Sequence, residues 1–93
     1  MKFLRTPEHK LLMKMLATAR KNVGLTQQQL AAKIGEKQNF ISKYERGERR
    51  LDALEITAIS RPIRFKFAHA VRDIEAKYGP IVNPKLRRPG KKK

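Results

Sequence analysis

The chain lacks cysteine and tryptophan, and only 6% of its 93 residues are aromatic. The absence of cysteine excludes a disulfide framework and a thiolate zinc site, so packing of mainly aliphatic side chains must hold the fold together. No apolar run approaches the roughly 18 residues of a membrane-spanning helix, and the N-terminal segment has no signal-peptide pattern. We therefore expect one small domain located in the cytoplasm.

Acidic residues are also scarce. The sequence has 8 Asp and Glu against 23 Lys and Arg, which gives a net charge of +15. The excess is uneven, with +6 in residues 1–60 and +9 in residues 61–93. Such a charge favours a polyanionic partner, because each phosphate that is neutralised releases condensed counterions. Nucleic acid is the leading candidate and an anionic membrane surface is the other, and charge alone does not separate them.

The spacing of apolar residues predicts helices, and no useful period-2 alternation indicates a strand. After a helix start at Thr6, the residues Leu12, Leu16, Ala19 and Val23 recur at intervals of four, three and four. Comparable patterns with start and stop signals predict five helices, at about residues 8–23, 26–34, 38–46, 52–60 and 62–78.

The ends of the chain differ from this helical body. Residues 1–7 are expected to be a short arm, and Ser60-Arg61-Pro62 predicts that one helix stops and the last one begins. After Gly79-Pro80 the apolar pattern stops, and "IVNPKLRRPGKKK" predicts a disordered basic tail over residues 80–93. The domain itself is therefore expected to be residues 8–79.

A sharp turn is expected between the second and third helices. Ala31 is small enough to let the next helix approach, Gly35 can take the positive φ of the turn, and Ile41 can fill the angle between the helices. That geometry would hold the third helix out from the body, so that its polar face could enter the major groove of DNA.

These residues carry a specific resemblance. Gln27, Ala31, Gly35 and Ile41 stand at the spacing of the phage-repressor/Cro-like (XRE-like) helix-turn-helix family. The stretches "TQQQLAAKIG" and "ISKYERGERR" are similar to that family's second helix and to the segment after its recognition helix. The resemblance covers roughly half of the chain. It implies an all-α, five-helix lambda-repressor-like domain, here with an atypically long C-terminal helix and a basic tail.

The resemblance implies roles for individual side chains. Gln27 matches a glutamine that grips a backbone phosphate, and three residues match positions that face base edges: Gln38, Asn39 and Lys43. Their chemistry fits, because Gln and Asn amides can pair with adenine and Lys can reach guanine. Ser42 lies on the same face and could reach a base or a phosphate. Phosphate contacts are also expected just past this helix, from Arg46, Arg49 and Arg50.

One further match is structural, and two positions depart from the family pattern. Arg20 and Glu45 match a pair that forms a largely buried ion bridge between the first and third helices. Glu36 and Lys37 stand where the family has an apolar residue and a Ser or Thr cap, so the recognition helix lacks its usual side-chain cap.

Phe40 could contact a thymine methyl group or pack between helices. The stripe from Phe67 to Tyr78 could be core or a dimer contact.

The sequence therefore predicts a transcription regulator that binds operator DNA as a homodimer on a palindrome, located at the nucleoid. One alternative is an antitoxin-like protein that holds a second polypeptide through residues 61–93. Another is a basic coating protein that binds nucleic acid or a membrane surface without a specific site. Enzymatic activity is not expected, because no catalytic constellation is present. His9 and His69 are isolated from each other, so neither a metal site nor a cofactor is expected.

Overall fold

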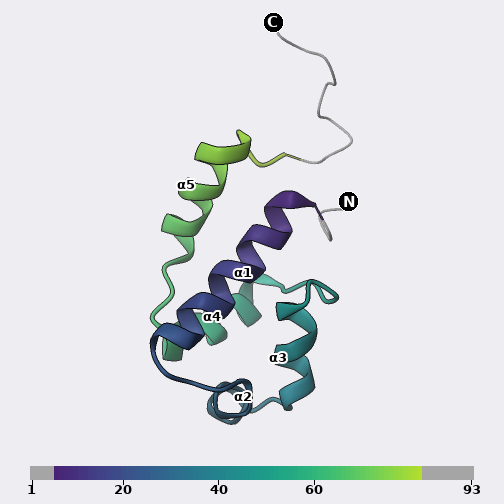
Figure 1. The fold of residues 1–93 in the computed structure, drawn as a ribbon, viewed down its shortest axis with the longest axis vertical. Coiled ribbons are helices and arrows are strands. Elements are labelled where there is room, and N and C mark those ends of the chain that lie inside the picture. The colour runs from purple at the N-terminus through teal and green to yellow at the C-terminus, as the bar shows by residue number, and fades with distance from the viewer. Residues whose placement is uncertain (1–5, 83–93) are drawn as a thin grey trace, which may run out of the picture.

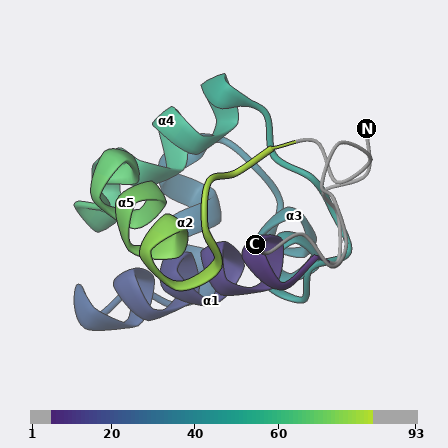
Figure 2. The ribbon, with the colours of Figure 1, turned by 90° about the horizontal axis from the view of Figure 1, so that it is seen from above.

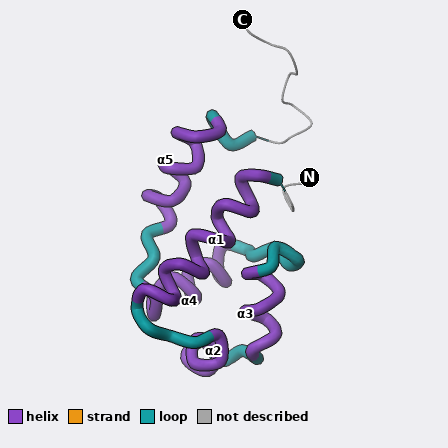
Figure 3. The backbone as a smooth tube through the Cα atoms, in the orientation of Figure 1, coloured by secondary structure: helices purple, strands orange, loops and turns teal. Residues whose placement is uncertain are grey.

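The computed structural model describes residues 6–82 of the chain (Figure 1). Within this range the backbone forms helices and connecting loops, without a strand (Figure 3). The helices are α1 (Pro7–Asn22), α2 (Gln27–Ile34), α3 (Gln38–Glu45), α4 (Ala53–Ile63) and α5 (Phe67–Tyr78). The predicted all-α, five-helix class is confirmed. Most of the expected N-terminal arm and basic tail falls on residues 1–5 and 83–93, which lie outside the described residues.

Three of the helices begin at side chains that cap free backbone N–H groups. The Thr6 hydroxyl accepts a hydrogen bond from the His9 amide at the start of α1. Thr26 and Asp52 each form a reciprocal capping box with the residue three positions later, at the starts of α2 and α4. These caps confirm the predicted starts. By contrast, Lys37 occupies the cap position of α3 and makes no side-chain cap hydrogen bond, as its side-chain chemistry predicts.

The core lies where α1 packs against α3, α4 and α5, and where α2 packs against α3 and α4 (Figures 1 and 2). Its buried members are mainly aliphatic, and the largest fully buried side chains are Tyr44, Leu16, Leu30, Ile41, Ile59, Ile63 and Ile74. Each such side chain contributes roughly 1.5–3 kcal/mol when it leaves water. One part of the predicted α1 stripe is wrong. Val23 is 38% exposed because α1 ends at Asn22, and Met13 lies in the core instead.

The break between α4 and α5 does not lie at Ser60-Arg61-Pro62, and the prediction of a restart there is wrong. Helix α4 continues through Pro62, although proline has no N–H to donate to the preceding turn. The reason is packing, because Ile59 and Ile63 stand one turn apart and are both buried in the core. The helix-start pattern at Ser60-Arg61-Pro62 is a local sequence signal. The burial of Ile59 and Ile63 against distant parts of the chain outweighs it.

Helix α4 ends instead at Arg64, which adopts left-handed backbone geometry with a φ of +56°. The Phe65 amide donates to the Ser60 carbonyl at 3.0 Å, and the Arg64 amide donates to the Arg61 carbonyl at 3.3 Å. This is the Schellman pattern that usually has glycine at the left-handed position. Arg64 is the only residue other than glycine with positive φ among residues 6–82.

Helix α5 packs against α1. Ala70 and Ile74 are buried, one turn apart, on the side of α5 that faces the core. Phe67 and Tyr78, at the two ends of the expected stripe, are 42% and 39% exposed. The stripe is therefore core in its middle and open surface at its ends.

The left-handed backbone conformation of Arg64 leads to a prediction about stability. Arg64→Gly should raise the free energy of unfolding by about 1 kcal/mol, because glycine reaches this φ without the steric cost of a Cβ. The melting temperature followed by circular dichroism should then rise by about 4–8 °C. Arg61→Gly is the matched control inside the helix and should lower stability by about 1 kcal/mol. A lower melting temperature for Arg64→Gly would show that no strain is relieved there.

Candidate nucleic-acid interface

The turn between α2 and α3 has the geometry that the sequence predicts. Gly35 has a φ of +72°, and the Glu36 amide donates to the Ala31 carbonyl at 2.9 Å. A Cβ built on Gly35 would meet nothing within 4 Å, so backbone conformation rather than space favours glycine here. Ala31 and Ile41 are both buried at the crossing of the two helices. The turn thus sets α3 at the edge of the bundle (Figure 1).

Helix α3 has one buried face and one open face. Ile41 and Tyr44 are fully buried, and burial raises the pKa of the Tyr44 hydroxyl. On the other face, Gln38, Asn39 and Lys43 are exposed. Ser42 is half-buried on the same side, and its hydroxyl donates to the Asn39 carbonyl at 3.3 Å. The four residues predicted to read bases therefore share one surface, because positions four apart align on a helix.

A buried ion pair ties α3 to α1. The Arg20 guanidinium donates to both carboxylate oxygens of Glu45, at 2.8 and 3.1 Å, and each side chain is only 8% exposed. A third hydrogen bond of 2.6 Å runs from Arg20 to the Leu25 carbonyl in the loop before α2. Hydrogen bonding to Glu45 raises the pKa of the Arg20 guanidinium. This confirms the bridge that the resemblance implies, and it shows that the bridge also holds the approach to α2.

The same carboxylate extends this network to the surface. The Gln27 side-chain amide donates to Glu45 Oε1 at 2.9 Å, and Gln27 Oε1 accepts from the Gln38 amide at 3.4 Å. Gln27 is half-buried and Gln38 is exposed. A chain of hydrogen bonds thus leads from the buried Arg20 to a glutamine on the open face of α3. Gln27 is therefore engaged within the protein, in addition to the phosphate contact that the resemblance implies for it.

The three arginines after α3 lie in three different environments. Arg46 pairs with Glu48 at 3.1 Å in a solvent-exposed bridge. Arg49 makes two hydrogen bonds to the Glu55 carboxylate, at 3.0 and 2.9 Å. Arg50 is exposed and makes no ion pair with any residue in the range 6–82. From the sequence, the same role, phosphate contact, is predicted for all three arginines. The sequence shows where the charges stand in the chain but not which side chains surround them.

Arg49 also connects α3 with the start of α4. Its guanidinium carbon lies 4.6 Å from the centroid of the Phe40 ring, and Phe40 packs edge-on against the buried Tyr44. The hydrogen bonds from Arg49 lower the pKa of Glu55, which also caps the Asp52 amide. Phe40 is thus a packing residue partly buried against the core, the second of the two roles considered for it.

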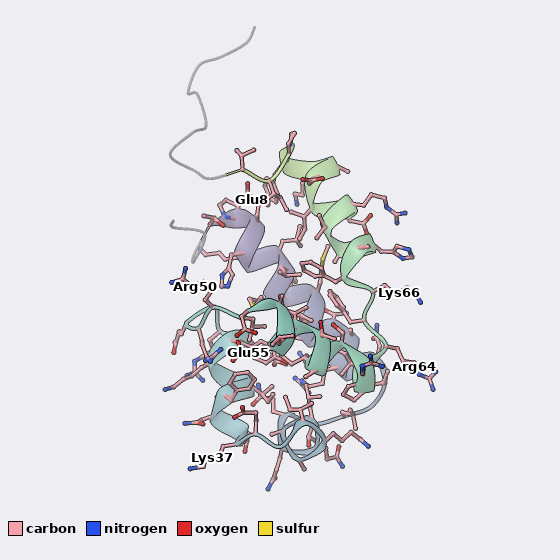
Figure 4. All side chains as sticks on the ribbon, turned by 180° about the vertical axis from the view of Figure 1, so that it is seen from behind. Glu8, Lys37, Arg50, Glu55, Arg64 and Lys66 are labelled. Carbon is pink, nitrogen blue, oxygen red and sulfur yellow. The ribbon has the colours of Figure 1, made fainter. Side chains whose placement is uncertain are left out.

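Two basic residues near α3 were not among the predicted contacts. Lys10 of α1 lies beside Arg46, around a shallow hollow of about 220 Å³ next to Gly47. Lys37 is exposed at the start of α3, on the same side of the molecule as Arg50 (Figure 4). Lys10 could not be found from local sequence, because only the packing of α1 brings it there. Lys37 could have been found from its position at the helix start.

The described residues contain no cluster of three or more His, Cys, Asp or Glu able to hold a metal ion. None of the helices in residues 6–82 combines the length and the hydropathy needed to span a membrane.

A short helix that projects a polar face, held by a glycine turn against its partner helix within a five-helix bundle, defines a helix-turn-helix domain. A helix-turn-helix family profile matches residues 16–68, which is more than half of the chain. The protein belongs to the XRE-type helix-turn-helix family, a family of DNA-binding transcription regulators. Comparison with curated proteins gives no match.

The buried ion pair leads to a second stability prediction. Glu45→Gln should lower the free energy of unfolding by about 3 kcal/mol, because the buried Arg20 guanidinium is left without a counter-charge. The matched control is Glu48→Gln, which removes the exposed partner of Arg46 and should cost less than about 1 kcal/mol. Urea unfolding of the two variants measures both values. Equal losses would show that burial of the Arg20 bridge contributes nothing to stability.

Proposed function

We propose that the protein is a sequence-specific transcription regulator that reads operator DNA in the major groove with α3. The observation that carries this proposal is the division of α3 into a buried face with Ile41 and Tyr44 and an open polar face. An α-helix fits the major groove, where each base pair offers a distinct pattern of donors and acceptors. We accordingly propose that the protein acts in the cytoplasm, bound to chromosomal DNA.

Three side chains of the open face are proposed to contact base edges: Gln38, Asn39 and Lys43. Among residues 6–82, the side chains of Asn39 and Lys43 make no hydrogen bond or ion pair and are exposed, so both can turn toward a base without losing an internal bond. Gln38 is held by Gln27, which limits the amide to fewer orientations before DNA arrives. Such preorganisation lowers the entropy lost on binding. Ser42 is proposed to reach a base or phosphate next to Asn39.

The phosphate contacts are proposed to differ in kind. Arg50 and Lys37 are exposed cations without an ion pair among the described residues, so they can bind phosphate directly. Arg46 can exchange its exposed Glu48 for phosphate at little cost, because exposed pairs contribute about 0–1 kcal/mol. Arg49 is proposed mainly to position Phe40 and α4, since leaving Glu55 would break two hydrogen bonds. Gln27 is proposed to contact phosphate at the start of α2.

A homodimer on a palindromic operator is proposed, with two α3 helices about 34 Å apart. Exposed apolar side chains gather at and after the end of α5, where Tyr78, Ile81 and Val82 are 36–39% exposed. A neighbouring copy bound to the adjacent half-site could cover them. This pairing would leave both α3 faces free for DNA.

Selection from random duplexes followed by footprinting tests the proposed function directly. We expect one sequence to be enriched, bound about 10³-fold or more tightly than bulk DNA at physiological salt. A footprint with two symmetric halves would support the homodimer, and a single half would contradict it. Enrichment of no sequence, with binding that falls steeply with salt, would instead indicate a coating protein.

Substitutions should then separate base reading from phosphate binding. Lys43→Ala should weaken binding to the selected duplex about tenfold or more and change bulk DNA binding much less, because it removes a base contact. Arg50→Ala should weaken both alike and reduce the salt slope by about 1. Gel-shift titrations at several salt concentrations measure both effects. The reverse pattern would contradict the assignment of Lys43 and Arg50.

A further inference from the structure

A groove lies between α4 and the loop that leads to α5. Its volume is about 870 Å³, within the range of ligand and peptide pockets. In Figure 4 Arg64 and Lys66 mark this side of the molecule, and they lie opposite Lys37 and Arg50 of the proposed DNA face. The groove could therefore be occupied while α3 is on DNA.

The floor of the groove is apolar for a specific reason. Ile56, Phe65 and Phe67 contribute ring and aliphatic surface. The two hydroxyl residues of the lining are turned onto their own helix: Thr57 donates to the Ala53 carbonyl at 2.8 Å, and Ser60 donates to the Ile56 carbonyl at 2.6 Å. With these hydroxyl protons already engaged, the groove favours an apolar occupant.

The rim of the groove is positively charged. Arg61, Arg64 and Lys66 line it and are exposed, and the lining contains no acidic residue. None of the three makes an ion pair with any residue between 6 and 82. Arg64 is also the residue in left-handed geometry, so the chain turns here at the end of α4. An occupant therefore has to combine apolar contacts with negative charge at its edges.

A second copy of this chain does not meet that requirement. The sequence has eight carboxylate side chains. Four are in ion pairs with arginine, namely Glu45, Glu48, Glu55 and Asp73. Glu8 is buried, Asp52 caps α4, and Glu75 accepts a hydrogen bond from the Ile81 amide. The eighth, Glu36, is exposed in the turn between α2 and α3, but it offers a single negative charge against the three rim cations.

The chain's own ends fit no better. The terminal stretches "MKFLR" and "KLRRPGKKK" contain basic residues and no acidic ones. Either would bring like charge to the rim, which opposes docking. Self-association through the groove would likewise place the three rim cations of one copy against those of the other.

We propose that this groove docks an acidic amphipathic helix of another polypeptide. The apolar anchors of that helix, spaced at i, i+3 or i+4 and i+7, would cover Ile56, Phe65 and Phe67. Glutamates or aspartates beside the anchors would pair with Arg61, Arg64 and Lys66. This surface is separate from the DNA face, so the inference does not depend on the proposed function.

A labelled synthetic helix of about 16 residues tests the proposal, with leucines at the anchor positions and glutamates beside them. Fluorescence anisotropy against the full chain at about 150 mM salt gives its affinity, and amide chemical shifts locate it. We expect the shifts to fall on α4 and residues 64–67. The same peptide with lysine in place of glutamate should bind at least about tenfold more weakly.

Two matched double variants separate the groove from general charge attraction. Arg61→Glu with Lys66→Glu should weaken binding of the acidic peptide about tenfold or more. The control, Arg72→Glu with Lys77→Glu, makes the same change in net charge on α5, outside the groove. It should weaken binding of the acidic peptide less than about threefold. Phe67→Ala should weaken binding at least about threefold, and its partial exposure leaves the fold intact.

The opposite results would overturn the proposal. These are the absence of peptide binding, equal losses in the two double variants, or chemical shifts confined to α3. Competition by duplex DNA for the same shifts would make the groove part of the DNA face. Self-association of the chain that Phe67→Ala abolishes, measured by sedimentation, would assign the groove to a second copy.

Discussion

The ion pair between Arg20 and Glu45 is the constraint on which the position of α3 and its open face depends. It joins the end of α1 to the end of α3, and through the Leu25 carbonyl it also holds the loop before α2. Its partners are almost fully desolvated, so the pair is specific in geometry and would be costly to break. Because Gln27 bonds to the same carboxylate, the orientation of the open face is coupled to the core.

In the proposed complex with DNA, attraction and specificity are carried by different groups. Most carboxylates are used inside the protein, as ion-pair partners, caps or a buried group, which leaves many cations exposed. Those cations give long-range attraction to polyanions without reading sequence. The side-chain amides of Gln38 and Asn39, which we propose contact base edges, are uncharged and suited to discriminating bases at short range. Arg64 and Lys66 of the α4–α5 groove lie on the opposite side of the molecule from Lys37 and Arg50 (Figure 4), where we propose that they meet a different partner.

Much of the fold could be predicted from local patterns, and the failures have identifiable causes. Caps at Thr6, Thr26 and Asp52 are local interactions, so the starts of α1, α2 and α4 follow from side-chain chemistry. The break near Pro62 was misplaced because burial of Ile59 and Ile63 outweighs the loss of one hydrogen bond. The Arg20–Glu45 bridge was reached through family resemblance, since a separation of 25 positions leaves no local signal.

The sequence by itself determined the helical class, the caps, the glycine turn at Gly35 and the excess of positive charge, because each depends on neighbouring residues or on composition. Only the tertiary structure decided how each charge is used. Arg46, Arg49 and Arg50 are close together in sequence, yet one is in an exposed pair, one is held by Glu55 and Phe40, and one is unpaired within the described residues. The physical reason is that a charged side chain acts through its dielectric surroundings and its partners, which long-range packing supplies.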